Sequence, residues 1–383
     1  MILGDLIEQV DFRNSDGAAV ELLGVSIDKH FMPSVANVIG TDLTNYKVVT
    51  QGRFACNPMH VGRDEVLPIA LYSSSGSAIV SPAYFTFEVS SDKALPEYLS
   101  LLFGSPEFDR RCWFATDASV RGGLSWDALC NIPINLPSVE EQRRIITQFR
   151  AIQDRIAVLR QLNDKLAAMM YGLYESRILS HTSSNLPLNW KNAKLGELCE
   201  KIGSGATPRG GKSSYLGGET ALIRSMNVFD YHFSYANLAH IADAQAEKLD
   251  NVAVKPYDVL LNITGVSVAR CCIVPEDVLP ARVNQHVMIL RAYDQDPHMN
   301  FLIMCSLCNQ FYKQQLLGIS QSGSTREAIN KGEMEEFEIA VPDDLVLTEF
   351  GQSAQALYQM MQVSLREMNM LSKMKELLLS HLA

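Results

Sequence analysis

The sequence predicts an α+β fold in which two similar mixed α/β domains are joined by two long antiparallel coiled-coil helices with pseudo-twofold symmetry. Three observations predict it: an internal repeat, short β-type runs in each half, and a long helical stripe at the end of each half. We expect a first domain over 1–137, a first spacer helix and linker over 138–184, a second domain over 185–342 and a C-terminal spacer helix over 343–383.

The composition is that of an ordinary globular protein. The chain has 383 residues, of which 47% are hydrophobic and 20% charged, so it buries substantial cores in two domains or more. Neither a signal peptide nor a run of about 18 apolar residues is present, so we expect a cytoplasmic protein with no membrane partner. The eight cysteines are scattered and are expected to be reduced thiols.

An internal repeat organises the chain. Ile132–Pro137 aligns with Phe337–Pro342 at an offset of 205 residues (132 to 337), and each run is strand-like and ends at a proline. Near the start of each half, Leu3–Val10 resembles Leu195–Ile202 at an offset of 192 residues (3 to 195), which implies insertions between the anchors. Several anchors in the same order favour a duplicated design over chance.

Each half is predicted to be β-rich first and helical afterwards. Residues 20–89 hold β-branched and aromatic runs separated by Gly, Ser, Asn and Pro, and Val252–Leu261 and Val283–Leu290 repeat this pattern. Amphipathic helices are expected over Leu95–Trp113 and Met299–Leu317.

A long helix is predicted to begin after Ser138, which stands three residues before Glu141 in a capping-box pattern, and to run to Ser180. It ends in the Ser-rich segment His181–Asn185, the predicted linker. Spacings that alternate between four and three indicate a coiled-coil seam, in which a buried Asn163 fixes the register. The seam comprises Ile145, Phe149, Ile152, Ile156, Leu159, Asn163, Leu166, Met170 and Leu173.

The C-terminal helix carries a matching stripe: Phe350, Ala354, Leu357, Met361, Met368, Leu371 and Leu378. Pseudo-twofold symmetry predicts that the two helices pair with each other, antiparallel. Packing of each helix on its own domain, or pairing between two chains, are the alternatives. About 40 helical residues span roughly 60 Å. That exceeds one DNA turn, about 34 Å, so the pair is long enough to separate two groove-reading domains.

The second half contains an ordered series of short motifs. They are Asn189-Trp190-Lys191, Leu195–Leu198, Ser204–Pro208, Tyr215–Gly218, Lys255–Leu260, Asn284-Gln285-His286 and Val341-Pro342. Their order and spacing resemble the target-recognition domain of type I restriction-modification specificity subunits. The first half is similar to that family at Leu136-Pro137 and Glu141–Ile145, but it lacks the Thr-Pro loop and has Gln51-Gly52-Arg53 in place of the Pro-Tyr-Asp turn.

The resemblance implies a non-catalytic subunit in which each recognition domain reads one half of a split double-stranded DNA target. Members of the family bind two adenine-N6 methyltransferase subunits and, in the full complex, two restriction (motor-nuclease) subunits. Helix faces outside the seam are then expected to dock the methyltransferase subunits. Those partners would supply positive charge to a chain of net charge −10. No cofactor, metal or catalytic residue is expected.

DNA specificity is expected in loops, where Arg pairs with guanine, Asn or Gln with adenine, and Lys, Ser and Thr hold phosphates. The candidates of the first domain are Arg13, Asn57, His60, Arg63, Tyr72 and Arg121. Those of the second are Thr207, Arg209, Lys212, Tyr215, Arg224, Arg270, Gln285, Ser324, Thr325 and Arg326. Arg121 and Arg326 are favoured slightly, because each precedes a short helix whose backbone amides face phosphate.

Other chemistry has weak support. Ala206–Ser213 fits a relaxed phosphate loop, but the helix-breaking Ser214–Gly218 follows it. Asn57–His60 lacks the second proline and the aromatic residue of an adenine-methyltransferase loop. Cys305 and Cys308 have metal-like spacing without a second pair, so core packing is expected. A self-contained methyltransferase or nuclease, a coiled-coil scaffold and a DNA mimic stay as alternatives.

Overall fold

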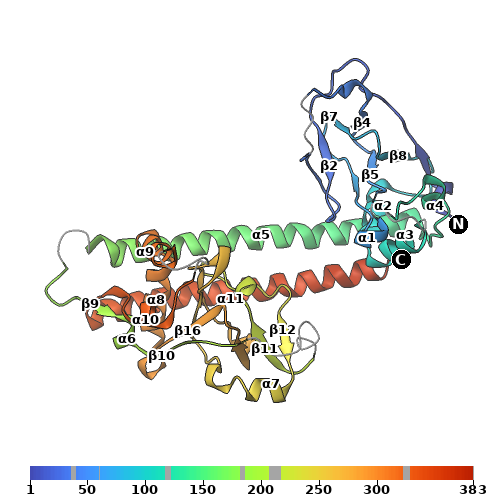
Figure 1. Cartoon of the computed structure of the whole chain (residues 1–383). Helices are drawn as coiled ribbons and strands as arrows, with labels where there is room; N and C mark the ends of the chain where they lie inside the picture. Colours follow the sequence, from blue (N-terminus) through green and yellow to red (C-terminus); the bar gives the residue numbers. More distant parts are fainter. Residues whose placement is uncertain are drawn as a thin grey trace. The chain divides into compact units, whose positions relative to one another are not determined.

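A computed structural model describes residues 1–35, 40–59, 61–116, 122–181, 186–206, 217–321 and 328–382 (Figure 1). The chain forms two compact units. The first contains residues 1–156 and 370–383, and the second contains residues 157–369. Each of the two long helices therefore contributes residues to both units.

The first unit combines an antiparallel sheet with short helices. The order of its four-stranded sheet is β1 (Ile7–Gln9), β8 (Phe85–Val89), β5 (Phe54–Cys56) and β6 (Ile69–Leu71). Two further antiparallel pairs are β2 (Leu23–Val25) with β3 (Phe31–Pro33) and β4 (Lys47–Thr50) with β7 (Ser77–Val80). Its short helices are α1 (Val61–Asp64), α2 (Pro96–Phe103), α3 (Pro106–Phe114) and α4 (Trp126–Cys130).

The second unit has a larger set of strands. Its four-stranded sheet is ordered β10 (Cys199–Ser204), β16 (Val287–Ala292), β13 (Val259–Asn262) and β14 (Cys271–Ile273). The others are a three-stranded sheet of β12 (Ala239–Ile241), β11 (Thr220–Ile223) and β15 (Ala281–Val283), and the pair β17 (Glu338–Val341) with β9 (Lys191–Lys194). Its short helices are α6 (Leu195–Leu198), α7 (Asp243–Glu247), α8 (Pro297–Cys308), α9 (Gln310–Gln321) and α10 (Lys331–Glu335).

Two segments are each predicted to form one helix, Leu95–Trp113 and Met299–Leu317. Each segment forms two helices instead. In the first unit, Ser105 caps α3 by accepting a hydrogen bond from the Phe108 N–H, and Pro106 occupies the first turn. Proline suits this position because its fixed φ is helical and it has no N–H to leave unpaired. In the second unit, the extended Asn309 separates α8 from α9.

The sheet of the second unit is buried on both faces. Alternate side chains of β13 and β14 enter two different hydrophobic clusters, as the pleat of a strand requires. Cys271 lies in one cluster and Cys272 in the other, so the two side chains point to opposite faces of the sheet. Cys305 and Cys308 are buried in α8, which confirms core packing. Among the helices described, none is long and apolar enough to cross a membrane.

The internal repeat is visible in backbone hydrogen bonds. Two bonds of the first unit recur in the second at the offsets found in the sequence. They are Leu3 N–H to Ile132 O (2.9 Å), repeated as Leu195 N–H to Phe337 O (2.8 Å), and Leu124 N–H to Pro58 O (3.1 Å), repeated as Ile329 N–H to Ile263 O (2.9 Å). The prediction of one design used twice is confirmed at this level.

The long helices α5 (Val139–Arg177) and α11 (Asp344–Ser380) pair antiparallel. Within the second unit, the Ser364 hydroxyl donates to the Leu159 carbonyl oxygen at 3.4 Å, while Tyr174 and Phe350 have ring centroids 6.2 Å apart. From the first of these contacts to the second, the position advances along α5 and goes back along α11, as an antiparallel pair requires. Residues 182–185 of the predicted linker lie outside the described residues.

Contacts near the middle of the helix pair join positions equivalent in the repeat. Leu159 meets Ser364, and the side-chain amide of Asn163 lies 3.4 Å from Met368 Sδ. Both pairs are 205 residues apart, which is the offset of the repeat. This pattern is expected where a pseudo-twofold axis crosses the pair, although the symmetry of the complete halves stays a prediction.

The predicted seam positions from Phe149 to Leu166 are buried, whereas beyond Leu166 the buried positions differ from the predicted ones. Leu173 and Leu357 are only half-buried, whereas Tyr174 and Tyr358 face the core. The reason is a change of period: a coiled coil repeats every 3.5 residues, and a helix that packs on a domain repeats every 3.6. Here the tyrosines also bond to the domain, Tyr174 by accepting from the Ser306 hydroxyl (3.0 Å) and Tyr358 by donating to a backbone carbonyl (2.7 Å).

The long helices pair with each other and also pack on the domains, and the remaining seam residues are buried to different depths. Less than a tenth of the residue is exposed for Phe149, Ile152, Ile156, Leu159, Asn163, Leu166, Phe350 and Met361, while Met368 and Leu371 are half-buried.

Candidate nucleic-acid interface

Several loops of the second unit meet at one edge of its two sheets. Because β11 and β15 are parallel, with Ile223 opposite Val283, the residues that follow them emerge on the same side. The Asn284 N–H donates to the Ile223 carbonyl at 3.1 Å, and the Ile263 N–H donates to the His286 carbonyl at 3.0 Å. The end of β13 therefore joins this group, which we call the loop edge. Its described members are Gly205, Arg224, Asn262–Thr264, Arg270 and Asn284–His286.

Most of the predicted DNA contacts of the second domain belong to two segments that continue from this edge. Thr207, Arg209, Lys212, Tyr215, Ser324, Thr325 and Arg326 lie outside the described residues. The residues that flank these segments are described. The Gly205 N–H donates to the Asn284 carbonyl at 3.1 Å, and Ala328 pairs with Thr264.

Gly205 stands where a side chain has no room. A Cβ built there would lie 1.8 Å from the carbonyl oxygen of Val283, whereas at Gly203 it would meet only the far end of the Lys201 side chain at 3.5 Å. We expect Gly205→Ala to lower the free energy of unfolding by about 1–3 kcal/mol, as overpacking against backbone does. Gly203→Ala, two residues earlier in β10, is the control and should change it much less. Urea unfolding of both variants checks this, and equal effects would contradict it.

Polar side chains on the loop edge form a hydrogen-bonded series. Thr264 Oγ1 lies 2.6 Å from His286 Nδ1, and Gln285 Nε2 lies 2.9 Å from His286 Nε2. Asn284 is buried, and its side-chain oxygen accepts from the His286 N–H at 3.0 Å. In the motif Asn284-Gln285-His286, the asparagine thus forms the turn, while the exposed Gln285 presents an amide that is suited to adenine.

Asn262 holds the loop edge together through buried hydrogen bonds. The sequence does not single it out. It is fully buried, and its side-chain amide donates to the carbonyls of Ser225 (2.9 Å) and Val228 (3.4 Å). Its counterpart 205 residues earlier is Asn57, whose side-chain oxygen accepts from the Met59 N–H at 3.2 Å. Asn57 therefore forms a turn, and the repeat offset is the sequence signal that could have pointed to Asn262.

The two described arginines of this edge have different surroundings. Arg224 donates through its guanidinium to the Asn237 carbonyl. Arg270 lies over the ring of Phe229, with Cζ 4.8 Å from the ring centroid. The sequence does not reveal the role of Phe229, because its contact with Arg270 joins residues that are 41 positions apart (229 to 270).

The candidates of the first unit are dispersed. Arg13 bonds to Asp11 at 2.7 Å and Arg63 bonds to Asp64 at 2.7 Å, so both cations have carboxylate partners. Tyr72 is 4% exposed and packs edge-on against Phe31 in a core cluster, so we leave it out of the interface. His60 and Arg121 lie outside the part of the chain that the structure describes.

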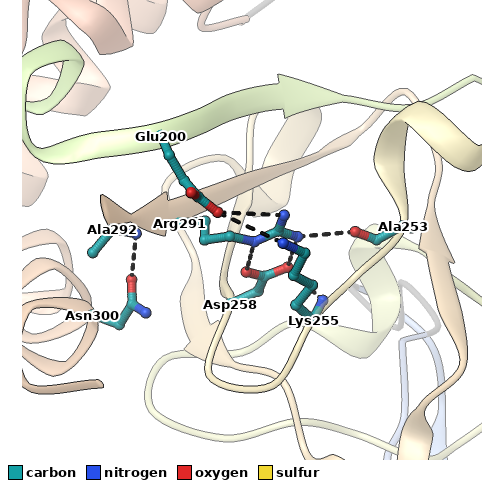
Figure 2. A network of polar contacts seen from close by, with 7 residues as sticks. All are labelled: Glu200, Ala253, Lys255, Asp258, Arg291, Ala292 and Asn300. Atoms are coloured by element: carbon teal, nitrogen blue, oxygen red, sulfur yellow. Dashed lines mark hydrogen bonds and ion pairs between the residues drawn. The ribbon is translucent and has the colours of Figure 1, made fainter. Parts of the chain in front are cut away.

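An ion pair anchors the opposite end of β13 (Figure 2). The Arg291 guanidinium donates to both carboxylate oxygens of Asp258 (2.6 and 2.7 Å) and to the Ala253 carbonyl (2.9 Å), and Glu200 lies 3.9 Å away. Asp258 is fully buried and also accepts from the Lys255 N–H at 2.8 Å. Burial raises the pKa of the Asp258 carboxyl above its ordinary value, and the bonds from Arg291 and Lys255 oppose part of this rise.

The same turn links the domain to a long helix. Tyr257 has a positive φ of 64°, and its hydroxyl accepts from the Gln355 side chain of α11 at 3.2 Å. Its counterpart in the repeat is Gly52, which also has a positive φ, 89°. The Pro-Tyr-Asp turn and the Gln51-Gly52-Arg53 turn therefore occupy the same place in the repeat and share a positive φ at the central residue.

The ion pair beside this bend has opposite polarity in the two units. Asp258, directly before β13, pairs with Arg291 of β16. In the first unit, Arg53 directly precedes the equivalent strand β5 and lies 3.2 Å from Glu88 of β8. One position thus holds an acid in one unit and a base in the other. Across the described ranges, His, Cys, Asp and Glu side chains form no group of three or more that is placed to hold a metal ion.

Two duplicated α+β units on a pair of antiparallel helices define the class of fold found in type I restriction-modification specificity subunits. The chain is 28% identical over 102 residues to the specificity subunit of the type I restriction enzyme HindI of Haemophilus influenzae strain Rd. That match covers 26% of this chain and 22% of the relative, so it spans about a fifth of the curated protein. No family model matches the sequence.

One solved structure has the same fold over the whole chain. The S subunit of a type I restriction-modification system from M. genitalium superimposes with a TM-score of 0.56 at 12% identity, covering 100% of this chain and 95% of that one. An HsdS subunit from Thermoanaerobacter tengcongensis has a TM-score of 0.40 at 18% identity, covering 99% and 94%. The chain is thus similar to type I specificity subunits in sequence over one segment and in fold throughout.

Proposed function

We propose that this chain is the DNA-recognition subunit of a type I restriction-modification complex, and that each mixed domain reads one half of a bipartite double-stranded target. The observation that carries the proposal is the duplication: the same backbone hydrogen bonds recur in both units at the repeat offsets. A single chain with two copies of one domain on paired helices suits a target made of two half-sites.

In this proposal the chain binds DNA without catalysis. Adenine-N6 methyltransferase subunits modify the target, and restriction subunits cleave or translocate DNA. The net charge of −10 fits such a division of labour, because phosphate attraction needs cations that the methyltransferase subunits supply. We place the complex in the cytoplasm, where it meets DNA.

The methyltransferase subunits are proposed to dock on an apolar face of the helix pair. Within the second unit, α5 and α11 enclose a groove of about 430 Å³. Its rim carries Met169 and Met360, whose exposed fractions are 57% and 54%. Exposed apolar side chains that line a groove are typical of a protein interface. The lining residues are Met169, Gly172, Leu173, Ser176, Ser353, Ala356, Leu357 and Met360.

Selection from a randomised duplex library tests the proposal. The purified chain, alone and mixed with a cognate adenine methyltransferase subunit, is expected to enrich two short half-sites separated by a fixed gap. Each domain should supply one half-site, because each carries its own loops. A motif without a gap would contradict bipartite reading, and no enrichment by a folded, partner-bound chain would favour a scaffold or a DNA mimic.

A further inference from the structure

Arg270 differs from the other arginines of the mixed domains. In the described parts of those domains, the other guanidinium groups bond to carboxylates or backbone carbonyls, and the Arg270 guanidinium bonds to neither. The bonded ones are Arg13, Arg53, Arg63, Arg110, Arg111, Arg224, Arg282 and Arg291. In a chain of net charge −10, a partly exposed guanidinium without an acceptor is suited to a ligand that brings acceptors of its own.

An aromatic column holds this guanidinium in place. Phe229 lies beneath it at 4.8 Å and is stacked on His232, with ring centroids 5.1 Å apart and ring planes 12° apart. The Phe229 N–H donates to the His232 carbonyl at 3.1 Å, which closes a tight turn. The Tyr231 N–H donates to the Cys271 carbonyl at 2.9 Å, so the turn is tied to the strand that Arg270 directly precedes. The three planar groups are therefore ordered without a ligand.

The aromatic column of Arg270, Phe229 and His232 lies at the loop edge. The Asn262 N–H donates to the Arg270 carbonyl at 2.9 Å, and the Asn262 side chain donates to the carbonyl of Val228, the neighbour of Phe229, at 3.4 Å. The end of β13 thus fixes both members of the cation–π contact. Thr264 and the exposed Gln285 belong to the same edge, which therefore also carries a hydroxyl and an amide.

We propose that Arg270, oriented by Phe229, is a base-reading residue of the second domain, and that its paired N–H groups contact O6 and N7 of one guanine in the major groove. The inference rests on the proposed function and deepens it. A planar guanidinium stacked on an aromatic ring keeps its fork of donors in one orientation, which suits a bidentate contact with guanine. The same fork can also bind phosphate oxygens, but a phosphate contact would carry no preference for one base pair, and this difference is what the test measures.

The test uses the full chain and the bipartite duplex found by selection, with affinities measured by fluorescence anisotropy. Arg270→Ala should weaken binding to that duplex roughly 5- to 150-fold, the range for one bidentate base contact. It should also abolish the preference at one G·C pair of the half-site read by the second domain. Replacing that pair should weaken the wild-type chain by a similar factor and leave Arg270→Ala unaffected.

Matched variants separate the possible roles of the side chain. Arg270→Lys keeps the charge but lacks the planar fork, so it should lose the preference for that base pair as well. Phe229→Leu keeps an apolar contact without the ring and should lose part of the same preference. Lys331→Ala removes one exposed positive charge from the same unit and should leave the preference intact. Thermal unfolding confirms that each variant is folded.

Three results would overturn the inference. An equal loss on every duplex, with a smaller dependence on salt, identifies a phosphate contact. Unchanged binding by Arg270→Ala shows that the column lies off the DNA, while the proposed function stands on its enriched motif. If no split motif is enriched at all, the proposed function fails and this inference fails with it.

Discussion

Arg291→Met is expected to lower the free energy of unfolding of the second unit by about 3–5 kcal/mol, the usual cost of removing one partner of a buried ion pair. The reason is the surroundings of Asp258. Its carboxyl group is fully buried and loses two hydrogen bonds from the guanidinium, while the Ala253 carbonyl loses its donor. Hydrogen exchange of the backbone amides in β13 and β16 measures this change in the second unit itself.

Two further variants make that measurement specific. Lys331→Met breaks an exposed ion pair in the same unit, 3.2 Å from Glu335, and should cost about 0.5 kcal/mol or less. The double variant Asp258→Asn, Arg291→Met removes both charges and should recover a large part of the loss, because no unpaired ion is left in the core. If Arg291→Met cost no more than Lys331→Met, the ion pair would not be what anchors β13.

Met170→Asp is the second substitution with a large expected effect. Met170 is fully buried in the core that α5 shares with the second unit, so a carboxylate there loses its water and gains no cation. An unpaired buried ion costs several kcal/mol, which is a large share of the stability of a domain. We expect the second unit to lose its cooperative unfolding transition, measured by circular dichroism during heating.

The neighbouring methionine supplies the control. Met169 is 57% exposed on the rim of the helix groove, so Met169→Asp should change the free energy of unfolding by less than about 0.5 kcal/mol. The same variant should bind the methyltransferase subunit more weakly, because a charge enters the proposed docking face. A folded Met169→Asp chain that binds its partner normally would remove this groove from the proposal, and equal stability effects of the two variants would refute the assignment of Met170 to the core.

The sequence predicts the buried positions of the helix pair well in the part where the two helices mainly contact each other. From Phe149 to Leu166 the seam follows the heptad pattern, and those residues are buried. Tyr174 and Tyr358 were missed, because they lie where the helices pack on a domain and the period lengthens. The two helices predicted as single ones are broken locally, by Pro106 in one half and the extended Asn309 in the other.

The candidate interface is harder to predict, because it is built from contacts across long stretches of chain. A list of polar loop residues finds Arg270 and Gln285, but it does not reveal Phe229, which orients Arg270 through space. It also includes Tyr72, whose side chain is needed for the core. The repeat is the sequence signal that does carry such information, since Asn57 and Asn262 occupy equivalent places one offset apart.

The reversed ion pair limits how the two halves of such a chain can recombine. A hybrid domain that paired β5 with β16 would set Arg53 against Arg291, and one that paired β13 with β8 would set Asp258 against Glu88. Like charges directly opposite each other destabilise a sheet, and here one member of each pair is buried. Crossovers between domains keep both ion pairs intact, whereas a crossover that falls between the two partners of an ion pair, such as Arg53 and Glu88, separates them. Under the proposed function, in which each domain reads one half-site, new combinations of specificity are therefore most accessible through the exchange of complete domains.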